Sequence, residues 1–241
     1  MAYTILYNQQ KENEAMRKGD EKRQELLQAA ERLFCQQGYE RTSVQDILNE
    51  ISLSKGGFYH HFASKEEVLT ALCDRRAERA AMYTAEALSQ AESALQRLNA
   101  VLHGFMPLRR EEADFVAMLL PTIEKAEGRG IAMTYQDALV AHFSPLLKAE
   151  IAAASAVEAI YPPVKDIEGV ILHLVNHCWM EAAAEMACAR REGQRLEQLT
   201  LLHLLEKYRR AIEALLDAPF GSMEIIRVEE WDEVFRQMKD I

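Results

Sequence analysis

Glycine and proline are scarce in this chain, whose 241 residues contain only 10 glycines and 6 prolines. The sequence also has no sustained alternation of apolar and polar residues, which is the pattern of a half-buried strand. Apolar residues recur instead at spacings of three and four along most of the chain. These absences argue against a β-rich or low-complexity protein, so we expect an all-α fold.

Long apolar runs are absent as well. No uninterrupted stretch of about 18 apolar residues occurs, and the N-terminus has no basic flank followed by an apolar segment. We therefore expect neither a signal peptide nor a membrane span, and we place the protein in the cytoplasm.

Chemistry-bearing motifs are few. The four cysteines, Cys35, Cys73, Cys178 and Cys188, show no CxxC spacing and lie in apolar helical stretches, which favours reduced, packed thiols. The sequence contains no nucleophile–base set, phosphate loop or paired acid motif. We expect no enzyme activity, no cofactor and no metal ion.

The net charge of −10 is unevenly distributed. Residues 1–65 hold nine basic and nine acidic side chains, so the remaining 19 basic and 29 acidic ones carry the whole excess. The stretch 51–65 contains two lysines and two histidines but no carboxylate. A small basic surface on an acidic protein would orient it toward the phosphates of DNA.

Apolar periodicity and capping residues divide the chain into helices. The pattern predicts a DNA-binding domain over 20–66 and a second helical domain over 67–241, preceded by a flexible tail over 1–19. Gly38 is expected as a left-handed helix cap, Gly128–Gly130 as a turn, and Pro145 as a kink inside a helix. The predicted helices are 20–37, 44–51, 55–61, 64–87, 90–106, 109–120, 131–154, 166–192, 195–217 and 224–239.

Two short helices joined by a turn, over 44–61, have the layout of a helix-turn-helix. The sequence from Leu26 to Leu69, with its Gly38-Tyr39 helix exit and the segment SKGGFYHHFASKEE, resembles the DNA-binding region of the tetracycline-repressor (TetR) family. The resemblance covers about a fifth of the chain. It implies an N-terminal three-helix DNA-binding domain and a C-terminal helical domain that binds a ligand and dimerises.

The resemblance also implies which residues meet a double-stranded DNA operator. Tyr59 and Lys65 would hold phosphates, while Lys55 and His60 would lie closest to the bases or to the DNA backbone. Gly56 would allow close approach of the backbone, and Gly57 stands where a side chain is commoner, so that one base contact would be lost. The full predicted DNA-binding set is Thr42, Ser43, Ser54, Lys55, Gly56, Gly57, Tyr59, His60, His61 and Lys65.

Two neighbouring turn positions add expectations of their own. Thr42 or Ser43 caps the helix that follows, and both offer hydroxyls suited to a phosphate as well. Ser52 stands where the family usually has a glycine, so a positive φ is expected there. Phe58 and Phe62 are expected in the core.

The segment 201–215 carries an a/d seam, which needs a partner helix, and the helix 170–187 is apolar on nearly every side. The resemblance implies that these two helices of each subunit form a four-helix bundle, which is the interface of a homodimer. Packing within one chain is the alternative. The predicted interface residues are Leu172, Val175, Trp179, Leu201, Leu205, Tyr208, Ile212 and Leu215.

A polar face on the helix 170–187 has three interpretations: a satisfied core network, the lining of a ligand site, or a metal site formed by two histidines spaced i, i+4. Aromatic and methionine residues elsewhere would supply apolar walls for a hydrophobic small-molecule effector. The predicted ligand-binding set is Phe105, Phe115, Met118, Tyr135, His142, His173, Asn176, His177 and Met180.

Together these features predict a homodimeric DNA-binding repressor that an effector releases from a palindromic operator. The alternative is a DNA-binding dimer without an effector, whose second domain serves only dimerisation or protein partners.

Overall fold

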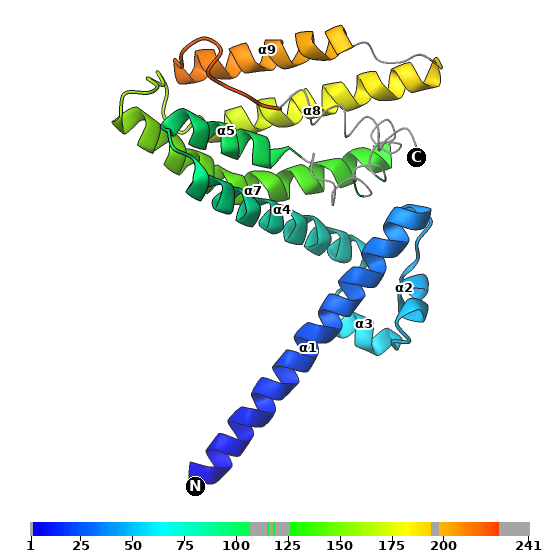
Figure 1. Cartoon of the computed structure of the whole chain (residues 1–241). Coiled ribbons are helices and arrows are strands. Elements are labelled where there is room, and N and C mark those ends of the chain that lie inside the picture. The colour runs from blue at the N-terminus through cyan, green and yellow to red at the C-terminus, as the bar shows by residue number, and fades with distance from the viewer. Residues whose placement is uncertain (1, 107–114, 116–117, 119–125, 194–197, 227–241) are drawn as a thin grey trace. The chain divides into compact units, whose positions relative to one another are not determined.

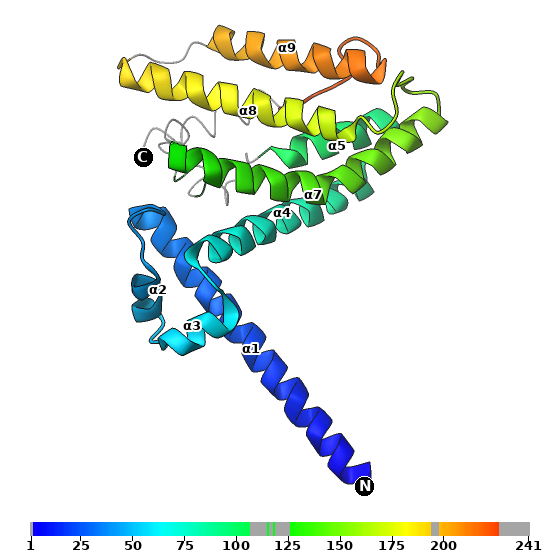
Figure 2. The same cartoon turned by 180° about the vertical axis from the view of Figure 1, so that it is seen from behind.

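The structure is a computed structural model that describes residues 2–106, 115, 118, 126–193 and 198–226 (Figures 1 and 2). Side chains are described from residue 19 onward, except at 126–129, 186, 187, 190 and 198. These residues form helices and short connections, without a strand. The chain divides into two units, Met1–Leu72 and Cys73–Ile241. The division falls inside helix α4 (Lys65–Gln90), a few residues after the predicted boundary.

Helix α1 spans Ala2–Gln37 and therefore begins well before the predicted Asp20. The segment expected as a flexible tail is instead a continuation of this helix. Residues 2–18 contain neither glycine nor proline and are rich in glutamine, lysine, glutamate and alanine, which favour helix. A single glycine at position 19 costs only about 1 kcal/mol and does not break it. As predicted, α1 is closed by Gly38, whose φ is 89° and whose N–H donates to the Phe34 carbonyl at 3.0 Å.

Helix α2 (Val44–Glu50) begins at a capping box. The Ser43 hydroxyl accepts from the Asp46 backbone N–H at 3.1 Å, and the Asp46 carboxylate accepts from the Ser43 N–H at 2.8 Å. After α2 the chain turns at Ser52, which has the expected positive φ of 53°. These local signals fix the helix that enters the turn.

Helix α3 (Lys55–His61) starts from Ser54, whose hydroxyl accepts from the Gly57 N–H at 3.2 Å. Phe58 and Phe62 are buried, as expected, and lie in the core of the first unit. The other members of that core include Leu26, Leu27, Phe34, Ile47 and Leu48. Figures 1 and 2 show α2 and α3 together beside the C-terminal half of α1.

The second unit is a stack of helices. It contains most of α4, then α5 (Ala94–Phe105), α7 (Ala126–Ala156), α8 (Glu168–Arg191) and α9 (Gln198–Leu216). Helix α5 packs on α7, both contact α8, and α9 lies along α8 (Figures 1 and 2).

Of three predicted features of this unit, one is wrong, one agrees with the structure and one lies largely outside the described residues. Helix α7 begins at Ala126 and runs through Gly128–Gly130, because the apolar periodicity that follows outweighs two helix-weakening glycines. Pro145 lies inside α7, as predicted. The predicted helix 109–120 lies outside the described residues except for Phe115 and Met118, which are helical.

Helices α4 and α5 cross closely at Gly104. A Cβ added there would lie 1.9 Å from the Thr84 hydroxyl oxygen and 3.0 Å from the Thr84 Cβ. Thr84 is itself buried, and its hydroxyl donates to the Ala80 carbonyl at 2.8 Å. Only glycine allows this approach.

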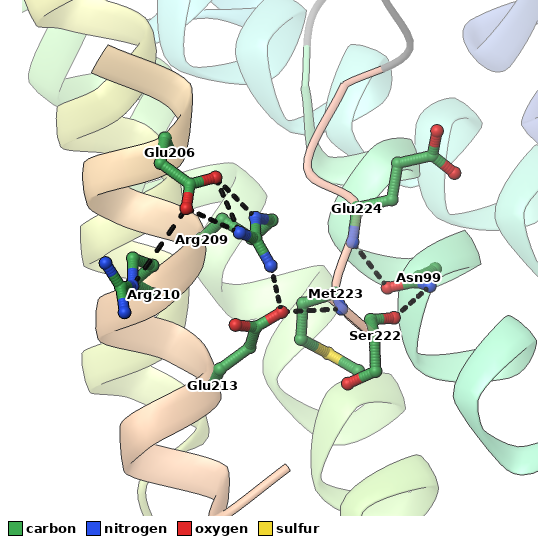
Figure 3. A network of polar contacts seen from close by, with 8 residues as sticks. All are labelled: Asn99, Glu206, Arg209, Arg210, Glu213, Ser222, Met223 and Glu224. Carbon is green, nitrogen blue, oxygen red and sulfur yellow. Dashed lines mark hydrogen bonds and ion pairs between the residues drawn. The ribbon is translucent and has the colours of Figure 1, made fainter. Parts of the chain in front are cut away.

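A short segment after α9 is clamped onto the second unit by polar contacts (Figure 3). The Asn99 side chain on α5 donates to the Ser222 carbonyl and accepts from the Glu224 N–H, both at 2.9 Å. Buried Glu213 on α9 accepts from the Met223 N–H at 3.1 Å and from Arg209 at 2.6 Å. Residues 224–226 are therefore not helical, contrary to the predicted helix 224–239, and the rest of that helix lies outside the described residues.

Candidate functional site

The outer face of α3 carries polar and cationic side chains. Lys55, Tyr59 and His60 are exposed, and Tyr59 is 59% exposed although its neighbour Phe58 is fully buried. The Tyr59 ring meets the Phe58 ring edge to face at 5.3 Å, yet most of the Tyr59 side chain is left to solvent. This face is the part of the helix-turn-helix that could enter a DNA groove.

The two glycines of α3 have different surroundings. A Cβ at Gly56 would meet nothing closer than the Ser54 hydroxyl at 4.0 Å, so the chain itself does not require glycine there. A Cβ at Gly57 would lie 2.7 Å from Leu53 Cδ1 and 3.0 Å from Leu53 Cγ. The structure therefore offers a second explanation of Gly57 besides the expected loss of a base contact. Leu53 occupies the space in which a side chain at position 57 would lie.

The three hydroxyl residues of the predicted DNA-binding set already form hydrogen bonds within the protein. Thr42 is only 1% exposed, and its hydroxyl donates to the Gly38 carbonyl at 2.8 Å. The N-cap of α2 is Ser43 and not Thr42. Ser54 caps α3. All three hydroxyls therefore form hydrogen bonds within the helix-turn-helix, and a phosphate contact stays a prediction for each.

Lys65 and His61 lie at the edge of this surface. The Lys65 ammonium donates to the Tyr39 carbonyl at 3.0 Å and lies 4.1 Å from the centroid of the Tyr39 ring. This contact fixes the start of α4 against the exit of α1. Burial, followed by the nearby His60 and Arg23, lowers the pKa of His61 and favours its neutral form.

The carboxylates next to the surface are held by partners on α1 and α2. Hydrogen bonds from the Ser43 side chain and backbone lower the pKa of Asp46. Glu50 pairs with Arg32 at 3.2 Å. The acidic groups of α2 are therefore occupied locally, beside a stretch 51–65 that has none.

Within the second unit, four of the predicted ligand-binding residues form a buried aromatic region: Phe105, Phe115, Met118 and Tyr135. The Phe115 and Tyr135 rings meet edge to face at 5.1 Å, and Phe105 meets Phe143 in the same way at 5.4 Å. All four are nearly inaccessible in the chain as it stands.

Sequence reasoning missed a charged member of this region. Arg76 on α4 is only 5% exposed, and its guanidinium lies 4.3 Å from the centroid of the Phe115 ring. Its spacing from Leu69, Leu72 and Cys73 puts it on the apolar stripe of α4, and that position was the available signal.

His142 also belongs near α4. Its Nε2 lies 2.8 Å from the Asp74 carboxylate, which ties α7 to α4. Asp74 was not predicted, because the two residues are 68 positions apart in the sequence.

The polar face of α8 is not buried, which disagrees with its interpretation as a satisfied network in the core. His173 and His177 are exposed, and Asn176 and Met180 are half-buried. The periodicity of α8 could not show this, because the helix is apolar on nearly every side. These four residues form the "α8 histidine face".

The predicted dimer seam is covered mostly by the chain itself. Leu172, Val175, Trp179, Leu201, Tyr208 and Ile212 are buried within the single chain, and Leu205 and Leu215 are half-buried. An a/d seam needs a partner helix, and α8 and α9 serve one another here. The alternative of packing within one chain accounts for most of the seam, and dimerisation stays a prediction.

Two kinds of feature are absent from the described residues. They contain no group of three or more histidine, cysteine, aspartate or glutamate side chains arranged to hold a metal ion. None of the described helices is both long enough and apolar enough to cross a membrane.

Residues 26–72 match the sequence profile of the bacterial regulatory proteins of the tetR family. Among curated proteins, the transcriptional repressor AcnR of Corynebacterium diphtheriae is 38% identical over 65 residues, which are 27% of this chain and 34% of AcnR. Matches to two uncharacterised regulators of Bacillus subtilis span 19% and 18% of those proteins. Sequence similarity to these relatives is thus confined to a minor part of their length.

Solved structures share the fold over more of the chain. A TetR-family regulator from Rhodococcus sp. is 20% identical, with a TM-score of 0.53, over 81% of this chain and 99% of that one. A transcriptional regulator from Saccharomonospora viridis, solved with choline, is 18% identical, with a TM-score of 0.51, over 80% of this chain and 96% of that one. Residues 26–72 of this chain thus form the helix-turn-helix domain of the tetR family of bacterial regulatory proteins.

Proposed function

We propose that this chain is a homodimeric repressor that a small hydrophobic molecule releases from a palindromic DNA operator. The observation that carries the DNA-binding part is the exposed face of α3. Lys55, Tyr59 and His60 point away from the core there, and Gly56 leaves an open backbone that nothing inside the protein requires. A helix with cationic and phenolic side chains and a bare backbone near its start suits close contact with a phosphate-lined groove.

The effector would bind in the aromatic region of the second unit. Phe105, Phe115 and Tyr135 supply apolar surface, and Arg76 adds a buried positive charge. The choline complex of the neighbour from Saccharomonospora viridis supports a ligand site in this fold. Because Arg76 already lies over the Phe115 ring, we infer a neutral or anionic effector in preference to a cation.

Helix α4 would couple effector to operator. It begins at Lys65, directly after the helix-turn-helix, and continues to Gln90 without a break. Within the second unit it carries Asp74, paired with His142 of α7, and Arg76. A ligand that displaces α7 or Phe115 would therefore act on the same helix that follows the DNA-binding surface.

The alternative, a DNA-binding dimer without an effector, also has support. The aromatic region is almost fully buried, which is what a passive core requires. A closed core admits a ligand only if it opens, whereas a core without a ligand needs no opening.

The test begins with an operator selected from random DNA by the full-length protein. Tyr59→Phe and Lys55→Ala should weaken binding to this operator without unfolding the protein, and Met82→Ala, an exposed change on α4, is the control. Full affinity in both α3 variants would refute the assigned surface. A small-molecule thermal-shift screen follows, and compounds that raise the melting temperature of wild type but not of Phe115→Leu should release the operator. Stabilising compounds that leave DNA binding unchanged would support the alternative.

Dimerisation is tested separately, on the exposed side of α8 and α9. Leu202→Glu on α9 places a carboxylate on a surface that is already exposed in one chain, so it should break a dimer without disrupting the fold. Val157→Glu, at an apolar residue that is exposed elsewhere in the second unit, is the control. A dimer that survives Leu202→Glu in sedimentation would place the interface on another surface.

A further inference from the structure

The α8 histidine face carries two imidazoles one helical turn apart. His173 and His177 are spaced i, i+4, so they lie on the same side of α8, and both are exposed. The His177 side chain is 73% exposed although its ring is anchored to α9. Two imidazoles at this spacing on a helix can hold one metal ion between them, provided that the correct ring nitrogens are free.

The tautomer of His173 follows from its partner. Its Nδ1 lies 2.7 Å from the Gly169 carbonyl oxygen. A carbonyl can only accept, so Nδ1 must carry the proton and donate it. In the neutral ring the lone pair therefore belongs to Nε2, the nitrogen farther from the helix backbone.

The tautomer of His177 follows from a chain of hydrogen bonds to α9. Its Nδ1 lies 2.5 Å from the Tyr208 hydroxyl, and that hydroxyl lies 2.6 Å from the Glu181 carboxylate. Lys207 donates to both oxygens of Glu181 at 2.8 Å, so this carboxylate is ionised and accepts. Tyr208 has one proton, which goes to Glu181, and its oxygen is left to accept from His177 Nδ1.

We propose that α8 binds a divalent transition-metal ion such as Cu²⁺ or Zn²⁺ through Nε2 of His173 and Nε2 of His177. Each ring donates its Nδ1–H to an oxygen. His173 donates to a backbone carbonyl, and His177 donates to the Tyr208 hydroxyl, which is itself hydrogen-bonded to the Glu181 carboxylate. Metal-binding histidines are usually oriented in this way, because the second hydrogen bond fixes the tautomer and makes the metal-binding nitrogen more basic. Imidazole nitrogens favour copper, zinc and nickel over magnesium and calcium.

The remaining groups on this face limit what the metal could do. The half-buried Asn176 amide and Met180 thioether lie on the same side of α8 and are further donors, with water completing the coordination. Leu174 follows the first histidine, at the position where helical zinc peptidases carry a glutamate base. We therefore assign the site to metal binding and not to hydrolysis.

The test uses the untagged full-length protein, stripped of metal and titrated with Cu²⁺ alone. Wild type should bind one ion per chain at this site, with an electron paramagnetic resonance spectrum that shows nitrogen ligands. His173→Ala and His177→Ala should each abolish that signal. His203→Ala, which removes an exposed histidine from α9, is the matched control and should retain it. An unchanged nitrogen signal in either α8 variant, or equal loss in the control, would overturn the proposal.

A second variant tests the proposed role of Tyr208. Tyr208→Phe removes the oxygen that accepts from His177 and should weaken Cu²⁺ binding by about 10- to 100-fold, the usual effect of losing such a partner. Circular dichroism and melting confirm that the variant is folded. Wild-type affinity in a folded Tyr208→Phe protein would refute the tautomer argument. None of these measurements uses DNA, so their outcome is independent of the proposed operator function.

Discussion

Gly56 and Gly57 are adjacent in α3, and the structure predicts opposite consequences for the same substitution. Gly56→Ala adds a methyl group to open space, so it should leave the fold intact and stabilise α3 by up to about 1 kcal/mol. If the bare backbone at Gly56 faces DNA, the same methyl group prevents close approach. An overpacked contact costs about 1 to 3 kcal/mol, which corresponds to roughly a 5- to 150-fold loss of operator affinity.

Gly57→Ala should behave in the reverse way. Its Cβ would lie 2.7 Å from Leu53 Cδ1, so Leu53 must move, and we expect a net destabilisation of about 1 kcal/mol. Leu53→Ala removes the obstacle, and the double variant should regain the helix-forming benefit of alanine.

Urea denaturation gives the stability of wild type, the three single variants and the double variant. Fluorescence anisotropy gives their affinity for the selected operator. Full operator affinity in Gly56→Ala would refute the view that the α3 backbone approaches DNA there. Strictly additive effects of Gly57→Ala and Leu53→Ala would refute the steric explanation of Gly57.

Three further predictions concern the rest of the chain. Gly104→Ala should lower the melting temperature because its Cβ would lie 1.9 Å from the Thr84 hydroxyl. Adding Thr84→Ala should partly restore the melting temperature. An unaltered melting temperature in the Gly104→Ala variant would contradict the close crossing of α4 and α5. The pKa of Asp46 is lowered in the folded protein, so its capping interaction stabilises the fold above the unfolded pKa of about 3.9 and is lost as the pH falls through the folded value. The melting temperature of Asp46→Asn should therefore fall less steeply than that of wild type over this acidic range, and parallel curves would contradict the prediction. Burial raises the pKa of the Cys178 thiol to about 12. Iodoacetamide at pH 8 should therefore modify Cys35 and Cys188 but not Cys178 in the folded protein, as measured by mass spectrometry. Rapid modification of Cys178 would contradict its placement in the core.

The helix-turn-helix could be predicted almost residue by residue because its signals are local. Gly38, the capping residues and the strained Ser52 lie within a few positions of the structure they specify. The predicted start of α1 was wrong because the sequence signal there is weak. A polar segment without glycine or proline is equally compatible with a flexible tail and with a helix.

The second unit was harder to predict because its contacts join distant residues. The partners of His142 and Gly104 lie on α4, and no spacing within α5 or α7 indicates them. Periodicity identified α8 as apolar on most sides but could not tell which side α9 covers. As a result, the histidines predicted in a pocket lie on the surface, and most of the predicted dimer seam lies inside the chain.

The contacts of Asn99 bear on the order in which the protein folds during synthesis. Its side chain donates a hydrogen bond to the backbone carbonyl of Ser222, which lies 123 residues later in the chain. At about 5 to 20 residues per second, the ribosome needs roughly 6 to 25 s to make that interval. The helix-turn-helix can form during this time, whereas Asn99 and Glu213 wait for the segment that satisfies them. The nascent regulator would therefore have a finished DNA-binding unit well before the C-terminal unit is closed.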